Sequence, residues 1–164
     1  MVIPGTEMDY DVETEVWNIY ELDDGTTIKI RTVLTKLIRD PHAKPPPGAD
    51  AGSKGVGFQA SFSNILVTHS AKLNVMGPPR TRPEPLPEAE TIDVGFTAFA
   101  EGWNVYKLKG EGVPKGMKIR VKLVVSSIVK AIGHFDQFGY PLYRVRSTNA
   151  VVPVTPEPRK RKRR

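Results

Sequence analysis

The sequence contains no cysteine and only three histidines among its 164 residues. Without thiols there is no disulfide framework, no thiolate zinc site and no cysteine nucleophile. A chain that lacks disulfides is compatible with a reducing interior, so we expect a cytoplasmic protein. The histidines do not lie at metal-ligand spacings, and both phosphate-binding glycine loops and the GxSxG elbow are missing. We therefore expect no cofactor, no metal and no enzymatic activity.

The sequence also lacks long apolar runs, and outside the C-terminal tail it carries no net charge. No stretch of 18 apolar residues occurs, which excludes a transmembrane helix, and we expect no membrane partner. Lys and Arg number 24 against 18 Asp and Glu, and six of these cations are residues 159–164. The remaining body has 18 residues of each sign. The protein as a whole is therefore not a basic nucleic-acid binder, and the net charge of +6 resides in its C-terminal tail.

An internal repeat dominates what is present. Residues 17–22 (WNIYEL) recur 86 positions later as residues 103–108 (WNVYKL). Three further matches follow the same order: 7–10 with 93–96, 28–39 with 119–130, and 58–67 with 143–152. Because the matches keep their order and character, we infer a tandem duplication.

The repeat divides the chain into four parts. The first β repeat covers residues 1–76, a proline-rich linker covers 77–91, the second β repeat covers 92–155, and a basic tail covers 156–164. Five prolines in residues 77–88 favour an extended spacer over a helix or a central strand. A proline-rich recognition ligand is the alternative for this linker.

The pattern within each copy is that of β-strands. Apolar and polar residues alternate with period two in residues 7–16 and 27–32, and Asp23-Asp24-Gly25 is a tight-turn signal. The alternation changes phase at Val33-Leu34, which predicts a bend or bulge. We expect an all-β fold with two units of three to four antiparallel strands. Such a unit is too thin to fold alone, so the units either pack as a pseudo-two-fold sandwich or small barrel, or each closes as a small barrel.

The motif Trp-Asn-x-Tyr-x-Leu followed by Ile-Lys-Ile-Arg (residues 17–22 and 28–31) and a Ser/Thr-Asn pair near a Val-rich strand end resembles uncharacterised β-rich proteins of archaea. Those proteins usually carry one copy, and the resemblance covers most of each copy here. It implies the duplicated β unit and brings no activity with it.

The basic C-terminal tail is the feature of the sequence that indicates function most specifically. Consecutive like charges repel one another, cannot fold alone and gain free energy by displacing counterions from a polyanion. The tail residues are Arg159, Lys160, Arg161, Lys162, Arg163 and Arg164. The second copy is also the more basic half, and its candidate backbone-binding residues are Lys118, Arg120, Lys122, Lys130, Arg144 and Arg146. The loop aromatics Phe135, Phe138 and Tyr140 are candidates for stacking on bases, or alternatively plug the end of the barrel.

The first 24 residues hold eight carboxylates and no basic residue. Four of them, at positions 7, 9, 11 and 13, share one face of the first strand and could bind a cation. The simpler interpretation is cross-strand pairing with Lys29 and Arg31.

Two functions remain open from the sequence. The first is a non-enzymatic protein that binds nucleic acid, with RNA or a ribonucleoprotein favoured, through its basic tail and a basic strand face. The alternative is a structural or assembly protein, such as a shell, virion or complex component, that joins partners or copies of itself through β surfaces and edges.

Overall fold

The computed structural model describes residues 5–39, 57–80, 90–110 and 113–155. Most of these residues lie in β-strands. The first half contains β1 (Thr6–Glu7), β2 (Asp9–Thr14), β3 (Trp17–Leu22), β4 (Thr27–Arg39) and β5 (Phe58–Ser70), followed by the 3₁₀ helix η1 (Leu73–Val75). The second half contains β6 (Thr91–Asp93), β7 (Phe96–Ala100), β8 (Asn104–Lys109), β9 (Lys118–Phe135) and β10 (Pro141–Val154).

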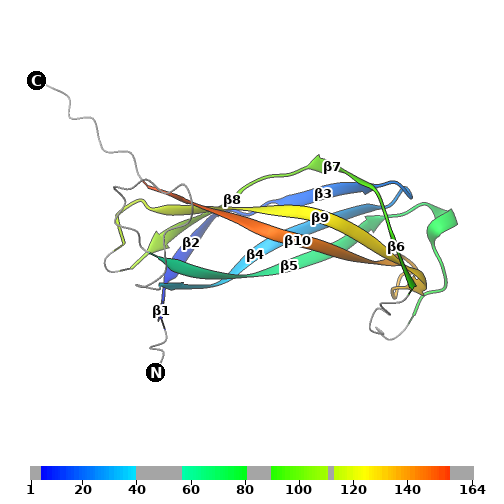
Figure 1. Ribbon diagram of the computed structural model, residues 1–164, viewed down its shortest axis with the longest axis horizontal. Coiled ribbons are helices and arrows are strands. Elements are labelled where there is room, and N and C mark those ends of the chain that lie inside the picture. Colours follow the sequence, from blue (N-terminus) through cyan, green and yellow to red (C-terminus); the bar gives the residue numbers. More distant parts are fainter. Residues whose placement is uncertain (1–4, 40–56, 81–89, 111–112, 156–164) are drawn as a thin grey trace, which may run out of the picture.

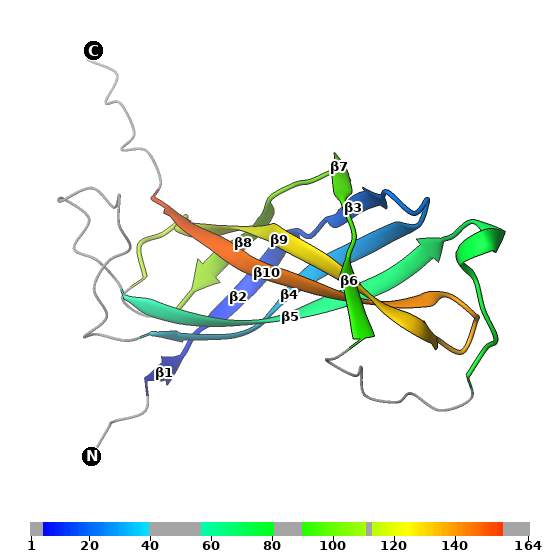
Figure 2. The same ribbon diagram turned by 45° about the vertical axis from the view of Figure 1, so that its right-hand side comes forward.

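The strands form two antiparallel sheets of five strands each. Sheet A contains β1, β3, β4, β5 and β7, and sheet B contains β2, β6, β8, β9 and β10. The long hairpins β4–β5 and β9–β10 run along the length of the molecule (Figures 1 and 2). Among the described residues the two sheets stay separate, so the expected sandwich is confirmed and the expected barrel is wrong.

The second strand of each copy, β2 or β7, belongs to the sheet of the other copy. After β1 pairs with β4, the chain crosses at Met8 and β2 pairs with β8. In the same way, β6 pairs with β9 and then β7 pairs with β3. Strands that pass from one sheet to the other at a corner are a known feature of packed β-sheets. The two halves are therefore interlocked around a pseudo-two-fold axis.

Because the strands are exchanged, the hydrophobic core consists of two mixed clusters. The first holds Met8, Leu34 and Leu37 from the first copy with Tyr106, Leu108, Met117, Ile119 and Val121 from the second. The other holds Tyr20, Leu22, Ile28 and Ile30 from the first copy with Val94, Leu123, Ile128 and Tyr143 from the second. Neither copy supplies a core of its own.

The phase change in the long strand is a β-bulge, as the sequence predicted. The register of β4 on β5 shifts between Leu34 and Lys36, so Thr35 is the extra residue, and its hydroxyl donates to the carbonyl of Ser61 at 3.0 Å. The second copy has an equivalent bulge at Ser126, whose hydroxyl donates to the carbonyl of Arg146 at 3.0 Å. Each bulge bends its hairpin at the same place.

Candidate nucleic-acid interface

Five cations lie on the outer face of sheet B. In β8 and β9 the buried residues Tyr106, Leu108, Ile119, Val121 and Leu123 alternate with residues that point away from the core. Strand pairing places Lys107 beside Lys118 and Val105 beside Arg120. We call the outward cations the basic strip, which consists of Lys107, Lys109, Lys118, Arg120 and Lys122.

The strip belongs to the second copy alone. The pseudo-equivalent positions on sheet A hold Glu21, Asp23, Thr27, Lys29 and Arg31. Five cations on sheet B therefore correspond to two cations and two carboxylates on sheet A. Lys107 and Lys109 are functional candidates that the sequence interpretation missed, and the change from WNIYEL to WNVYKL between the copies was the available signal.

The acidic row of the first strand partly neutralises the basic strip. The Nζ of Lys109 lies 2.6 Å from Asp11, and that of Lys118 lies 2.9 Å from Glu13. The expected pairing of these four carboxylates with Lys29 and Arg31 is wrong, because strand exchange carries β2 onto sheet B. Arg31 pairs instead with Glu15, just beyond β2, at 2.8 Å. The exposed pairs of Lys109 and Lys118 contribute about 0–1 kcal/mol each, so a phosphate could replace either carboxylate at little cost.

Trp103 lies at the end of the strip with a cation against its face. The guanidinium carbon of Arg120 is 4.5 Å from the ring centroid, and the Nζ of Lys122 is 5.9 Å away. Lys122 also lies 3.6 Å from Glu101. Trp103 is half-buried and belongs to neither core cluster, so its position is that of a surface ring. On sheet A, Arg31 stands 5.9 Å from the Trp17 ring in the same arrangement.

A buried tyrosine binds the glutamate that stands two residues before each tryptophan. Tyr106 donates to Glu15 at 3.0 Å, and Tyr20 donates to Glu101 at 2.9 Å. Burial, together with the neighbouring carboxylate of Glu15, raises the pKa of Tyr106 to about 12. Burial and the hydrogen bond to Glu101 likewise raise the pKa of Tyr20. Both phenols are therefore neutral donors, and both glutamates are held in place.

Lys130 is not available as a phosphate contact. Its Nζ lies 3.2 Å from Asp24, and the two side chains are only 19% and 11% exposed. The phenol of Tyr143 donates to the same Asp24 oxygen at 2.6 Å. Burial opposes the charge on Asp24, but the hydrogen bonds from Tyr143 and Thr26 outweigh that effect and lower its pKa. The structure thus places Lys130 in a packed polar cluster.

Arg144 and Arg146 occupy the outer face of β10, but beyond the bulge. They pair with Val129 and Ser127 of β9, whereas the basic strip lies beside residues 150–154 of β10. Neither arginine forms an ion pair within the described ranges. They remain candidate contacts, separate from the strip.

The structure does not bring the loop aromatics to the basic strip. Phe135 ends the 18-residue strand β9 and Lys118 begins it. At a rise of ~3.3 Å per residue, an extended strand of this length separates them by roughly 55 Å. Figure 1 shows the β9–β10 turn and the end of β10 at opposite ends of the molecule. Phe135 packs against Gly77, Tyr140 is half-buried, and Phe138 is 64% exposed. Trp103 is the aromatic residue that accompanies the strip.

The tail, Arg159 to Arg164, lies outside the described residues. The last residue of β10, Val154, pairs with Lys118 at the end of the basic strip. The described chain continues to Thr155, four residues before the tail cations begin. The sequence therefore joins the tail to the body beside Lys118.

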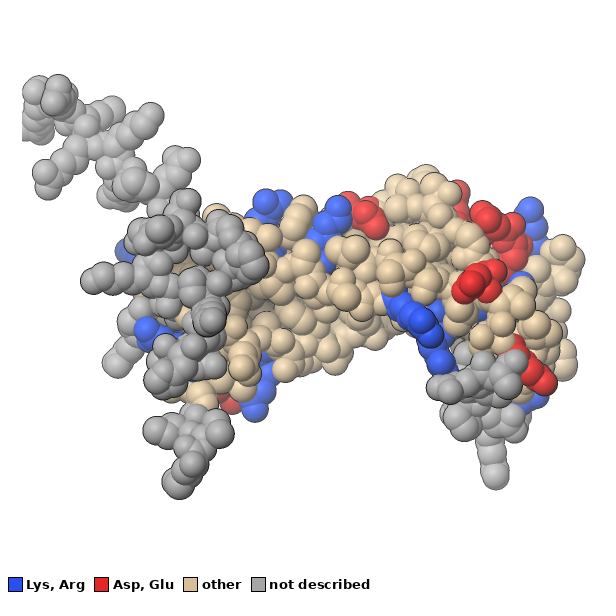
Figure 3. All heavy atoms as spheres, in the orientation of Figure 1, with Lys and Arg blue, Asp and Glu red and all other residues tan. Residues whose placement is uncertain are grey.

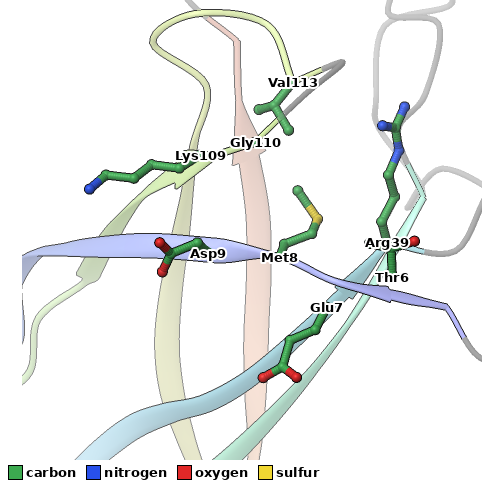
Figure 4. Close-up of a pocket in the computed structure, with 8 residues that line it drawn as sticks. All are labelled: Thr6, Glu7, Met8, Asp9, Arg39, Lys109, Gly110 and Val113. Carbon is green, nitrogen blue, oxygen red and sulfur yellow. The ribbon is translucent and has the colours of Figure 1, made fainter.

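One pocket of about 440 Å³ lies where β1 meets β2. Its lining residues are Thr6, Glu7, Met8, Asp9, Arg39, Lys109, Gly110 and Val113 (Figure 4). Figure 4 shows the charged ends of Glu7, Arg39 and Lys109 pointing away from one another. Because these charged groups do not converge on one point, the pocket does not indicate which class of ligand it would bind. At the other end of the molecule, the equivalent corner is filled by the Asp24–Lys130–Tyr143 cluster.

No protein-family model, curated protein or solved structure matches this chain. The part of the chain that the structure describes holds no group of three or more acidic or histidine side chains positioned for a metal ion. None of the described segments forms a helix with the length and hydropathy needed to span a membrane.

Proposed function

We propose that this protein is a non-enzymatic nucleic-acid-associated protein whose partner is an RNA or a ribonucleoprotein. The observation that carries the proposal is the run of six cations at residues 159–164, joined to a body with balanced charge. Phosphate contacts of this kind give affinity and orientation without base specificity.

The basic strip supports the same proposal. It borders the end of β10 from which the tail continues, so tail and strip offer one extended path for a phosphate backbone. Its ion pairs are exposed, with side-chain exposures of 38% for Lys118 and 48% for Lys109. Trp103 adds an aromatic ring on this path, although Arg120 now covers its face. A base would have to displace Arg120 to stack there.

Fluorescence anisotropy with labelled single-stranded RNA, duplex RNA and duplex DNA tests the proposal. The full chain and a chain ending at Pro158 are compared across a salt series. We expect the full chain to bind single-stranded RNA with a log–log salt slope of up to about −4, as six phosphate contacts would give. The shorter chain should bind more weakly with a shallower slope. Absence of binding to all three nucleic acids at low salt would contradict the proposal.

A structural or assembly role is the second candidate, and one observation favours it. Within the described part of the chain, the 13-residue strand β5 is an open edge of sheet A, and its sequence contains no Asp, Glu, Lys or Arg. Such an edge suits self-association through β surfaces. If the full chain forms a defined assembly without nucleic acid, this second function gains support.

A further inference from the structure

Each sheet ends in one long edge strand. Within the described residues, β5 pairs only with β4, and β10 pairs only with β9. The free side of such a strand presents unpaired N–H and C=O groups to any other strand. The pseudo-two-fold axis makes β5 and β10 equivalent, so their sequences can be compared position by position.

β10 carries the features that normally protect an edge. Arg144 and Arg146 place charge along it, and Pro153 removes one backbone donor. Cations and prolines are the usual means by which proteins prevent edge-to-edge pairing.

β5 has none of these features. The equivalents of Arg144, Arg146 and Pro153 are Gln59, Ser61 and Thr68, and its 13 residues include no Asp, Glu, Lys, Arg or Pro. Figure 3 shows a broad surface without charged side chains across the middle of this face of the molecule. An uncharged strand with high β-propensity and no proline tends to pair with the same strand of another molecule.

The exposed apolar residues of β5 lie together. Ile65, Leu66 and Val67 are 47%, 37% and 42% exposed. Just before them, the side-chain amide of Asn64 donates to Ser147 of β10 at 3.4 Å, which is where the two edges approach each other. The apolar segment available for pairing is therefore Ile65 to Val67, which begins after Asn64 and ends before the register irregularity at His69.

We propose that this segment of β5 pairs antiparallel with the same segment of a second copy, giving a two-fold dimer. The inference rests on the assembly role above and specifies its partner. A two-fold axis places each strand opposite itself, so the strand must be compatible with its own charge. β5 meets this condition because it is uncharged, whereas β10 would bring its own arginines together.

A dimer centred on Leu66 would place Ile65 of each copy opposite Val67 of the other. Directly opposed apolar side chains of neighbouring strands stabilise the pairing. Sheet A of one copy and sheet A of the other would then form one continuous sheet. Each dimer would carry two basic tails, and a polyanion that reached both would be held by both.

The test compares two matched substitutions in the full chain. Val67→Lys introduces a cation on β5, and Val152→Lys introduces one at the equivalent position of β10, where exposure is nearly the same at 43%. Molar mass is measured by light scattering after size exclusion, over a range of protein concentrations. Nuclease treatment and high salt remove bound nucleic acid beforehand, and circular dichroism confirms that each variant is folded.

We expect the wild-type chain and Val152→Lys to have twice the monomer mass, and Val67→Lys to have the monomer mass. A wild-type chain that is monomeric at every concentration would overturn the inference together with the assembly role. A dimer that Val67→Lys leaves intact would overturn only the assignment to β5. Neither result would affect the nucleic-acid proposal, which is measured separately.

Discussion

The phenol of Tyr106 donates a hydrogen bond of 3.0 Å to the carboxylate of Glu15, 91 residues earlier in the chain. The same bond joins Tyr20 to Glu101 at 2.9 Å across the pseudo-two-fold axis. Each bond links the two copies. The tyrosine lies in the core, and the glutamate lies between two strands that belong to different sheets.

The two tyrosines should differ in what they contribute to stability. The Tyr106 hydroxyl also accepts from the backbone N–H of Leu34 and from Asn104, both at 3.3 Å, whereas Glu101 is the hydrogen-bond partner found for Tyr20. Tyr106→Phe leaves a buried donor unsatisfied and should lower the free energy of unfolding by about 1–3 kcal/mol. Tyr20→Phe should lower it by about 0.5–1.5 kcal/mol. Urea unfolding followed by tryptophan fluorescence measures both, and equal losses would contradict the assigned networks.

Stability should fall on the alkaline side. The pKa of Tyr106 rises from about 10 in the unfolded chain to about 12 in the folded protein, so the folded state holds the phenolic proton more tightly. The associated stability is fully present below pH 10 and is lost as the pH rises through about 12. The unfolding midpoint in urea should therefore decrease over this range. The decrease should be smaller for Tyr106→Phe, and an unchanged decrease in that variant would show that other groups cause it.

The polar cluster of Asp24, Lys130 and Tyr143 should respond to acid. Hydrogen bonds hold the pKa of Asp24 below its ordinary value, so its contribution is present above about pH 4 and is lost as the pH falls further. Asp24→Asn should lower the free energy of unfolding at neutral pH by about 1–3 kcal/mol and weaken this acid dependence. Asp11→Asn, which breaks an exposed ion pair, is the control and should cost about 0–1 kcal/mol. If both variants behave alike, the cluster around Asp24 is not a buried one.

Strand exchange predicts that neither copy folds alone. A fragment of residues 1–76 lacks the second-copy residues of both core clusters, and a fragment of residues 77–164 lacks the first-copy residues. We expect fragments 1–76 and 77–164 to be unfolded separately and to regain β structure when mixed. Circular dichroism of each fragment and of the mixture measures this. A fragment that folds as a monomer would contradict the interlocked arrangement.

The sequence predicted the repeated unit well because period-two alternation and repeated blocks report local structure. The strands, the bulge near Val33-Leu34 and the pseudo-two-fold sandwich all follow from it. Alternation shows which face of a strand is buried and says nothing about which strand lies beside it. For this reason the sequence predicted ion pairs of the acidic row with Lys29 and Arg31. Strand exchange instead places Asp11 and Glu13 of this row beside Lys109 and Lys118.

The candidate site was harder to predict, for two physical reasons. Lys130 looks like its exposed neighbours in sequence, and only Asp24, in a turn 106 residues away, reveals that it is buried. Phe135, Phe138 and Tyr140 are near the basic residues in sequence, but an extended strand separates them from Lys118 by its full length. Trp103 repeats Trp17 in sequence, and both rings lie at the surface against cations.

The pseudo-two-fold axis supplies the most direct measurement of the central claim, that the basic strip of sheet B contacts nucleic acid. Arg120→Glu reverses one charge in the strip, and Lys29→Glu makes the same change at the equivalent position of sheet A. Anisotropy with single-stranded RNA is measured for both variants of the full chain across a salt series. We predict that Arg120→Glu weakens binding several-fold and reduces the salt slope by about 1, whereas Lys29→Glu stays close to the wild-type protein. Equal effects of the two changes would show that only net charge matters, and would contradict the assignment of the strip.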